Sequence, residues 1–327
     1  MVIAIRRESI AMNNHTHILH NDNPDGIDRR GFLKCMAWAG TGVLWTLGGG
    51  VLTSRVLGAS DSTASIDFSF VQISDSHIGF NKEANKDVIG TLQRAIAKIN
   101  ALPTPPDFVL HTGDLSHLSE AEEFDALEQN LKSIKTGEIF YVPGEHDVLS
   151  DNGALYRERF GKKASASGWY SFEKKGVHFI GLVNVLNIRE GGLGVLGPEQ
   201  LDWLKKDLAP LSTSTPIVVF AHIPLWAVYP QWGWGTDDAE QALGLLRRFG
   251  SVTVLNGHIH QTVRKVEGNI TFHTAMSTAF PQPAPGTAPK PGPMKVEAAR
   301  LSSVLGITDV NYLEGNHSLA IIDSTLA

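Results

Sequence analysis

The sequence of 327 residues has a single cysteine, Cys35, which excludes an intramolecular disulfide and a zinc site built from thiolates. It also lacks an excess of basic residues, since the formal net charge is −6. Residues 1–60 contain six Lys and Arg against four Asp and Glu, which leaves a charge of −8 on the rest. A globular portion this acidic has no general surface for nucleic-acid backbones. The apolar fraction of 42% suffices for a substantial core and excludes intrinsic disorder.

The N-terminal sixty residues differ from the rest of the chain. Residues 1–27 are polar and show no periodicity. The pair Arg29 and Arg30 then precedes residues 35–54, which carry no charge. A positive region followed by an apolar one is typical of a secretory signal, and the arginine pair resembles a twin-arginine signal. We therefore expect residues 1–60 to be a disordered tail with a signal, and the chain to be exported to the periplasm by the twin-arginine machinery.

An uncleaved signal segment is the alternative. Twenty uncharged residues could just span a bilayer, so residues 35–54 could anchor the protein in the membrane. Five glycines in this stretch lower its hydrophobicity and favour its removal. No other part of the chain is expected to contact a membrane.

From residue 61 onward, periodicity predicts alternating strands and helices. Apolar runs predict strands at 67–74, 108–111, 139–142, 169–172, 177–183, 217–220, 252–255, 270–273 and 319–322. Helical spacing predicts helices at 86–100, after Ser119, after Pro198 and near 238–248. Ser119 with Glu122 forms a capping-box pattern at the second of these. Three β-then-α units in succession favour parallel strands covered by helices, and therefore the α/β class.

We expect a single domain over residues 61–327, because neither a linker nor an internal repeat divides it. Two segments interrupt the alternation of elements. Residues 226–234 contain four aromatic side chains around a proline and a glycine, and residues 280–293 contain six prolines. The second segment is predicted to be a loop with stiff, extended stretches. Long loops in compact domains are often lids or binding surfaces.

Side chains that can bind metals follow five of the expected strands at their carboxyl ends. The motifs are DSH at 75–77, GD at 113–114, GEHD at 144–147, a histidine at 222 and GHIH at 257–260. In open α/β sheets this edge is where ligands bind. Imidazole and carboxylate without thiolate suit Zn, Mn, Fe or Co. Glycine before Asp114, Glu145 and His258 is expected to permit the tight turns that aim these side chains into a cleft.

The ordered motifs resemble those of the calcineurin-like metallophosphoesterase superfamily, whose run is D-x-H, G-D, G-N-H-[DE], H and G-H-x-H. The resemblance covers roughly residues 67–275. It implies a two-sheet β-sandwich flanked by helices, in four α/β/β/α layers, with two metal ions (Fe, Mn or Zn) at one edge. The residues implied are Asp75, His77 and His260 for the first metal, Asp114 as the bridge, and His222 and His258 for the second, with Glu145 in the place of the family's Asn.

The resemblance also implies hydrolysis of phosphate esters as the activity. Two metals a few ångströms apart can activate a bridging hydroxide that attacks phosphorus in line. His146 would be the catalytic histidine, which binds the phosphate or protonates the leaving oxygen. Asp147 would either orient His146 or be a solvated turn residue. The motifs resemble the bacterial cyclic-nucleotide and glycerophosphodiester branch of the family, so we expect a small-molecule phosphodiester or another small organic phosphate as substrate.

Glu145 changes the charge that the centre would carry. With Asn, two carboxylates and one hydroxide leave two divalent ions at a formal charge of about +1, whereas Glu145 brings the sum to about zero. An Fe(III)–M(II) pair would restore the positive charge, and a tightly held second metal with slow turnover is the other hypothesis. If Glu145 instead swings away, the second site is impaired. The chain would then be a non-catalytic binding or scaffold protein on the same fold.

Two tryptophans, Trp232 and Trp234, follow the candidate ligand His222 closely and are expected to overhang the metal site. Their ring faces could stack a flat leaving group, which would make them substrate-binding residues. The alternative is that these rings cover the edge of the sheet.

Three further histidines have structural explanations. His178 and His273 alternate with apolar strand residues and are expected to be packed and hydrogen-bonded. His117 is either a plain loop residue or, being three residues after Asp114, close enough to reach the phosphate.

Overall fold

The computed structural model describes residues 43–48, 51–56, 68–161, 168–313 and 318–327. The predicted tail and much of the predicted signal segment lie outside these residues. Within the first sixty residues, strands β1 (Val43–Gly48) and β2 (Val51–Val56) pair antiparallel. Within the described ranges no helix combines the length and the apolar character needed to cross a membrane.

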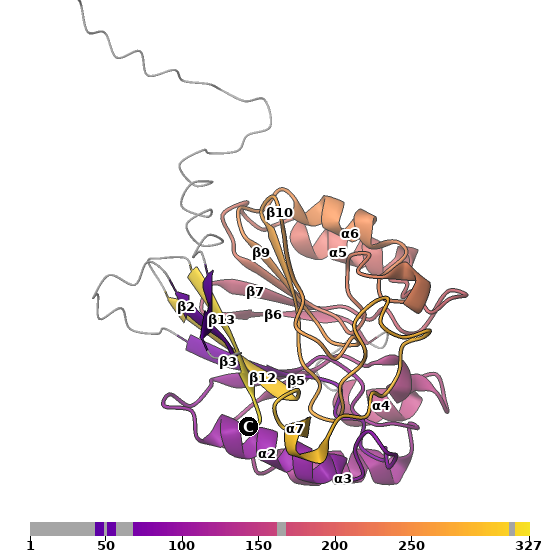
Figure 1. The fold of residues 1–327 in the computed structure, drawn as a ribbon. Coiled ribbons are helices and arrows are strands. Elements are labelled where there is room, and N and C mark those ends of the chain that lie inside the picture. Colours follow the sequence, from indigo (N-terminus) through magenta and orange to yellow (C-terminus); the bar gives the residue numbers. More distant parts are fainter. Residues whose placement is uncertain (1–42, 49–50, 57–67, 162–167, 314–317) are drawn as a thin grey trace, which may run out of the picture.

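Two β-sheets pack face to face, and helices cover the outer face of each sheet (Figure 1). In spatial order, the five-stranded sheet contains β13 (Ser318–Thr325), β12 (Gly306–Leu313), β3 (Phe68–Ile73), β4 (Phe108–His111) and β5 (Ile139–Tyr141). The six-stranded sheet contains β10 (Arg264–Glu267), β11 (Ile270–Thr274), β9 (Val252–Asn256), β8 (Ile217–Phe220), β7 (Val177–Gly181) and β6 (Tyr170–Lys174).

The helices form the two outer layers. Helices α2 (Val88–Asn100) and α3 (Ala121–Leu131) pack on the five-stranded sheet, and α5 (Pro198–Leu208) and α6 (Ala239–Leu246) pack on the six-stranded sheet. The remaining helical segments are η1 (Glu145–Val148), α4 (Ala154–Phe160), η3 (Pro230–Trp232) and α7 (Ala298–Leu301). The predicted four-layer α/β/β/α sandwich is therefore confirmed.

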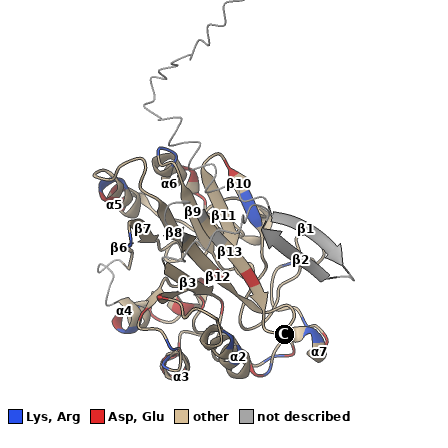
Figure 2. Cartoon of the chain, turned by 90° about the vertical axis from the view of Figure 1, so that its left-hand side faces the viewer, with Lys and Arg blue, Asp and Glu red and all other residues tan. Residues whose placement is uncertain are grey.

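The central strands are apolar on both faces because each face is buried. In β4, Phe108 and Leu110 face the core between the two sheets, whereas Val109 faces the helices. Strands buried on both sides read as continuous apolar runs, which is why periodicity located most of them. Charged residues lie on the helices and the connecting loops, and among the strands the edge strand β10 carries three of them (Figure 2).

The start of α3 differs from the prediction. The helix is capped by Glu120 with Glu123, one residue later than the expected pair of Ser119 and Glu122. Ser119 has a left-handed backbone with φ of 63°, and its hydroxyl donates to the backbone carbonyl of Asp147. Ser119 therefore belongs to the loop before the helix rather than to the cap.

Periodicity does not predict β10, β12 or α4. Strand β12 contains Thr308, Asp309 and Asn311, and it lies antiparallel between β13 and β3. Its buried Thr308 donates to the carboxylate of Asp323 on β13. A polar strand in the middle of a sheet is stable here because its polar side chains have partners.

The register of the parallel strands aligns their carboxyl ends. His111 at the end of β4 lies opposite Ile73 of β3 and Tyr141 of β5. In the other sheet, Phe220 of β8 lies opposite Leu255 of β9. The loops that leave these ends therefore start at the same edge of the sandwich.

The two strand histidines are packed and hydrogen-bonded, as predicted. His273 is buried and contacts Asp323 at 3.0 Å. His178 is paired with Glu173 of β6 and, at 2.8 Å, with Asp207 of α5. Burial lowers the pKa of His178, but the two carboxylates outweigh burial and raise it.

This raised pKa predicts a pH-dependent contribution to stability. A histidine whose pKa is higher in the folded state stabilises it fully below the unfolded value of about 6.5, and the contribution is lost as pH rises through the folded pKa. We expect His178→Gln to lower Tm more at pH 6 than at pH 9 in thermal unfolding. Asp207→Asn, which removes a partner of the same imidazolium, should show the same trend. An equal loss of Tm at both pH values would contradict this.

Candidate metal centre

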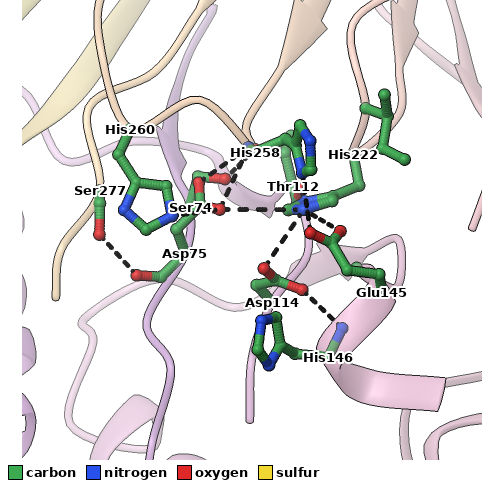
Figure 3. A network of polar contacts seen from close by, with 12 residues as sticks. Ser74, Asp75, Thr112, Asp114, Glu145, His146, His222, His258, His260 and Ser277 are labelled. Carbon is green, nitrogen blue, oxygen red and sulfur yellow. Dashed lines mark hydrogen bonds and ion pairs between the residues drawn. The ribbon is translucent and has the colours of Figure 1, made fainter. Parts of the chain in front are cut away.

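The predicted ligands lie on loops at the carboxyl ends of five strands, three from one sheet and two from the other. In chain order they are Asp75 and His77 after β3, Asp114 after β4, Glu145 after β5, His222 after β8, and His258 and His260 after β9. The carboxylates and imidazoles labelled in Figure 3 converge on one region. The structure thus brings together side chains from both ends of the domain.

Asp75, His77 and His260 form a first group of candidate ligands. Nε2 of His260 lies 3.2 Å from Oδ1 of Asp75 and 3.3 Å from Nε2 of His77. Each of the three residues is at most 2% exposed. Two imidazole nitrogens and a carboxylate oxygen this close together can bind one cation.

Glu145, His222 and His258 form a second group. Oε2 of Glu145 lies 2.9 Å from Nε2 of His222, and Oε1 lies 2.9 Å from Nδ1 of His258. The carboxylate thus reaches both histidines. Glu145 is therefore not turned away from the second group in this structure.

Asp114 lies between the two groups. Its Oδ2 is 3.3 Å from Nε2 of His77 in the first group and 3.4 Å from Nε2 of His222 in the second. The residue is 2% exposed. One oxygen at nearly equal distance from both groups occupies the place of a bridging ligand.

Backbone carbonyls fix the orientation of two of the imidazoles. Nδ1 of His222 lies 2.7 Å from the carbonyl oxygen of Thr112, and Nδ1 of His260 lies 2.6 Å from that of Phe280. A carbonyl only accepts, so each Nδ1 carries the proton and donates. In the neutral ring, Nε2 then offers its lone pair to the candidate centre.

The loops that carry the ligands have a strained backbone. Among the described residues, eight non-glycine residues have a left-handed φ, and five of these are candidate ligands. They are Asp75 (54°), His77 (41°), Asp114 (52°), His258 (70°) and His260 (54°). Each such conformation costs on the order of 1–3 kcal/mol and persists where the surroundings impose it. The loops therefore give up stability to direct these side chains.

Of the glycines before Asp114, Glu145 and His258, only the first meets the predicted need for a tight turn. Only Gly113 has a left-handed φ, of 97°. A Cβ on Gly144 would overlap the carboxylate of Asp114, and one on Gly257 would overlap the hydroxyl of Ser74 and lie 2.7 Å from Oδ2 of Asp75. Gly144 and Gly257 are thus required for space beside a carboxylate and not for turn conformation.

Neighbouring imidazoles keep the buried carboxylates ionised. Burial raises the pKa of Asp75, but His260 and His222 outweigh burial and hold it at about 2. Burial likewise raises the pKa of Glu145, and His258 with His222 hold it well below its usual value. Ionised carboxylates are acceptor-only groups, which is the form that binds cations.

The residues present fit a pair of metal ions. Oε2 of Glu145, Nε2 of His222 and both ring nitrogens of His258 are buried and make no hydrogen bond. Buried polar atoms are normally paired, so such a cluster requires an explanation. Glu145 lies within ion-pair distance of both histidines, but these atoms lack the geometry of a hydrogen bond with one another. A shared bound ion would account for this arrangement, and the imidazole and carboxylate donors suit Fe, Mn or Zn.

His146 lies beside Asp114 at the start of η1 (Figure 3). Its backbone N–H donates to Oδ1 of Asp114 at 2.9 Å, and its Nδ1 donates to the carbonyl of His117 at 2.6 Å. Nε2 is therefore the ring atom available to a substrate. Burial lowers the pKa of His146, but Asp114 and Glu145 outweigh burial and raise it. A protonated His146 can donate a proton.

Asp147 neither orients His146 nor lies in a solvated turn. It is fully buried. Its carboxylate accepts hydrogen bonds from the backbone N–H groups of Leu115, Ser116 and Gly144 and from the Ser116 hydroxyl. Asp147 thus joins the loop after β4 to the loop after β5.

His117 lies among the imidazoles of the centre, so of the two alternatives for it the plain loop residue is wrong. Its Nδ1 is 3.4 Å from Nδ1 of His77, and its ring stacks on that of His146 with centroids 4.8 Å apart. Burial, together with the neighbouring His146 and Lys82, lowers the pKa of His117 to about 4. The available signal was its place in the loop that carries Asp114.

The two tryptophans expected to bind substrate differ in exposure. Trp234 is 1% exposed, which leaves no ring face for stacking, so the role predicted for it is wrong. Trp232 is half-buried and packs edge-on against Trp234 and Tyr229. Burial of this segment favours the alternative in which the rings cover the sheet edge, and stacking by Trp232 stays a prediction.

The crowding at Gly144 predicts that Gly144→Ala damages the centre. Overpacking of this kind costs about 1–3 kcal/mol of unfolding free energy, and the displaced Asp114 should bind metal less tightly. Chemical denaturation and elemental analysis of bound metal measure the two effects. Gly137→Ala is the matched control, because no atom lies within 4 Å of a Cβ there. Equal metal content in the two variants would contradict the prediction.

Two relatives are similar to this chain over most of the domain. A 3′,5′-cyclic-nucleotide phosphodiesterase of Nostoc sp. is 26% identical over 221 residues, which are 66% of this chain and 80% of that protein. A probable glycerophosphodiester phosphodiesterase of Arcobacter nitrofigilis is 26% identical over 216 residues, which are 63% of this chain and 77% of that protein.

Solved structures share the fold at low sequence identity. A dimetal phosphatase of Danio rerio has a TM-score of 0.60 at 15% identity and covers 80% of this chain and 100% of its own. A purple acid phosphatase of yellow lupin has a TM-score of 0.59 at 16% identity, over 79% of this chain and 51% of its own. GAP50, the anchor in the inner membrane complex of Plasmodium, has a TM-score of 0.54 at 14% identity, over 79% and 84%.

The family model described as calcineurin-like phosphoesterase matches residues 68–262. The matched span is more than half of the chain, and it runs from the start of β3 to just beyond His260. It therefore contains every loop that contributes to the candidate centre. The chain belongs to the calcineurin-like phosphoesterase family.

Proposed function

We propose that this protein is a dinuclear-metal-dependent hydrolase of phosphate esters, with phosphodiesters or small organic phosphates as substrates. The observation that carries the proposal is the position of Asp114 Oδ2, which lies 3.3 Å from His77 in one ligand group and 3.4 Å from His222 in the other. A carboxylate so placed can hold two cations a few ångströms apart, which is the arrangement of two-metal phosphoesterases.

The seven ligand residues divide between the two ions. Asp75, His77 and His260 would hold the first, and Glu145, His222 and His258 the second, with Asp114 shared. A bound pair would supply Lewis acidity and an activated water at neutral pH. The protein's own contribution is preorganisation, because the strained loops and carbonyl-anchored imidazoles hold the ligand atoms in place beforehand.

His146 would assist the leaving group. Its Nδ1 is committed to the carbonyl of His117, so the ring cannot turn without losing a buried hydrogen bond. Nε2 is thereby kept as the atom that can donate a proton to a departing alkoxide or bind a phosphoryl oxygen.

The named relatives favour diesters over monoesters as the substrate class. Both relatives are named phosphodiesterases, one for cyclic nucleotides and one, a probable assignment, for glycerophosphodiesters. The substrate's size and charge would have to suit an acidic protein, because the domain beyond residue 60 carries a net charge of −8. A diester has one negative charge where a monoester has about two, which also favours diesters.

Glu145 stands where the family motif has Asn, and its negative charge changes which metal ions suit the centre. Because the carboxylate faces both His222 and His258, we infer that it ligates the second metal. The resulting lower charge is compensated if one of the two ions is Fe(III) and the other divalent.

A non-catalytic binding or scaffold protein is the second candidate. It is favoured by Glu145, and one protein that shares this fold is named an anchor. Retention of all other ligand residues and of His146 favours the enzyme instead.

We also propose export to the periplasm by the twin-arginine machinery, supported by Arg29, Arg30 and the uncharged stretch at 35–54. Cleavage of that stretch would release the domain, and retention would leave it membrane-anchored. Detection of the full-length chain only in the cytosol would contradict export.

Hydrolysis assays should separate the enzyme from the scaffold. With Mn, Fe or Zn supplied, we expect turnover of bis-p-nitrophenyl phosphate to exceed that of p-nitrophenyl phosphate. His146→Ala should lower kcat at least on the order of a hundredfold, the usual size of a general-acid contribution. His178→Gln, which lies outside the centre, serves as the control. Inactivity of the wild type with every metal would support the scaffold.

Substitution of Glu145 tests the charge of the centre. Removing one negative charge should make inorganic phosphate a tighter competitive inhibitor of Glu145→Asn than of the wild type, while Glu173→Gln leaves inhibition unchanged. Elemental analysis of active wild-type protein should find one iron per chain. Two plain divalent ions would contradict the Fe(III) hypothesis, and unchanged phosphate inhibition would indicate that Glu145 does not ligate.

A further inference from the structure

The three histidines that direct Nε2 at the centre differ in what holds the other ring nitrogen. His222 and His260 donate Nδ1–H to backbone carbonyls. His77 has no such carbonyl among the described contacts, and its Nδ1 instead faces Nδ1 of His117 at 3.4 Å. We propose that His117 is a positioning residue, whose neutral imidazole accepts the Nδ1–H of His77 and holds Nε2 of His77 on the first metal. This inference rests on the proposed metal centre.

The direction of this hydrogen bond follows from the position of His77. Nε2 of His77 lies 3.3 Å from Oδ2 of Asp114 and 3.3 Å from Nε2 of His260, so Nε2 is the atom in the ligand group. A ligating nitrogen must offer its lone pair, and the proton of the neutral ring is then on Nδ1. His117 can accept that proton's hydrogen bond only through an unprotonated Nδ1, which places its own proton on Nε2.

Packing on several sides fixes the ring of His117. It stacks on His146 at an interplanar angle of 16° and meets Phe80 edge-on at a centroid distance of 5.2 Å. Its backbone N–H donates to the carbonyl of Ile78 at 2.9 Å, next to His77 in the chain. The acceptor is therefore held in place before any metal binds, as an effective supporting residue must be.

Residue 117 makes two contacts that substitution can separate. Its carbonyl accepts from Nδ1 of His146, and this contact is independent of the side chain. Its imidazole alone contacts Nδ1 of His77. Backbone carbonyls orient the rings of His222 and His260, whereas the side chain of His117 orients the ring of His77.

Metal titration of two variants tests the proposal without relying on activity. His117→Phe keeps a ring against His146 and Phe80 but has no acceptor, whereas His117→Asn lacks the ring but offers Oδ1 near the place of Nδ1. We expect calorimetric titration of metal-free protein with Mn²⁺ to show first-site affinity about 10–100-fold weaker in His117→Phe, the usual cost of losing such a partner. In His117→Asn most of the affinity should return. His117→Leu, a smaller side chain without an acceptor, repeats the comparison if the phenylalanine variant does not fold.

Three results would overturn the proposal. Wild-type affinity in His117→Phe together with a loss in His117→Asn would mean that the ring packs rather than accepts, and equal losses in both variants would mean that an acceptor at this position does not support the metal site. A drop in the number of bound ions by one, with unchanged affinity for the others, would make His117 itself a ligand in a cluster with His77 and His146. A wild type that binds no Mn²⁺ would instead overturn the metal centre, and this role of His117 with it.

Discussion

A single buried carboxylate, that of Asp147, joins two of the loops that carry the candidate centre, the one after β4 and the one after β5. It accepts three backbone N–H groups and one hydroxyl, and it thereby ties the residues after Asp114 to the turn that begins at Gly144. These N–H groups are buried, and the carboxylate supplies the hydrogen-bond acceptor that they require. Without the Asp147 carboxylate, the loop that carries Asp114 would not be joined to the turn that carries His146.

Residue patterns predict the α/β class and the meeting of the seven ligand residues at one edge, whereas the four-layer arrangement is what the family resemblance implies. The class and the meeting of the ligands follow from one regularity, since strands buried on two faces read as apolar runs and the ligands follow those runs at their carboxyl ends. Parallel register then aligns the ends, as Ile73, His111 and Tyr141 illustrate. Family motifs supplied the division into two groups, which residue spacing by itself does not give.

Contacts between loops could not be predicted in this way. The roles of Asp147 and His117 depend on which backbone groups face them, and Trp234 is buried by a turn that periodicity does not describe. The glycines illustrate the same point, because a sequence indicates that a small residue is needed but not whether conformation or space requires it. Strand β12 is not predicted because its polar residues interrupt the apolar pattern, and the partner of Thr308 lies on a neighbouring strand.

The two sheets contribute different types of ligand to the candidate centre. All the candidate carboxylates leave the five-stranded sheet, while three of the four ligating imidazoles leave the six-stranded one. Neither sheet alone offers a complete coordination sphere for both ions. Two cations could therefore be fully coordinated only after the two sheets have packed together, and each would then link side chains of both sheets.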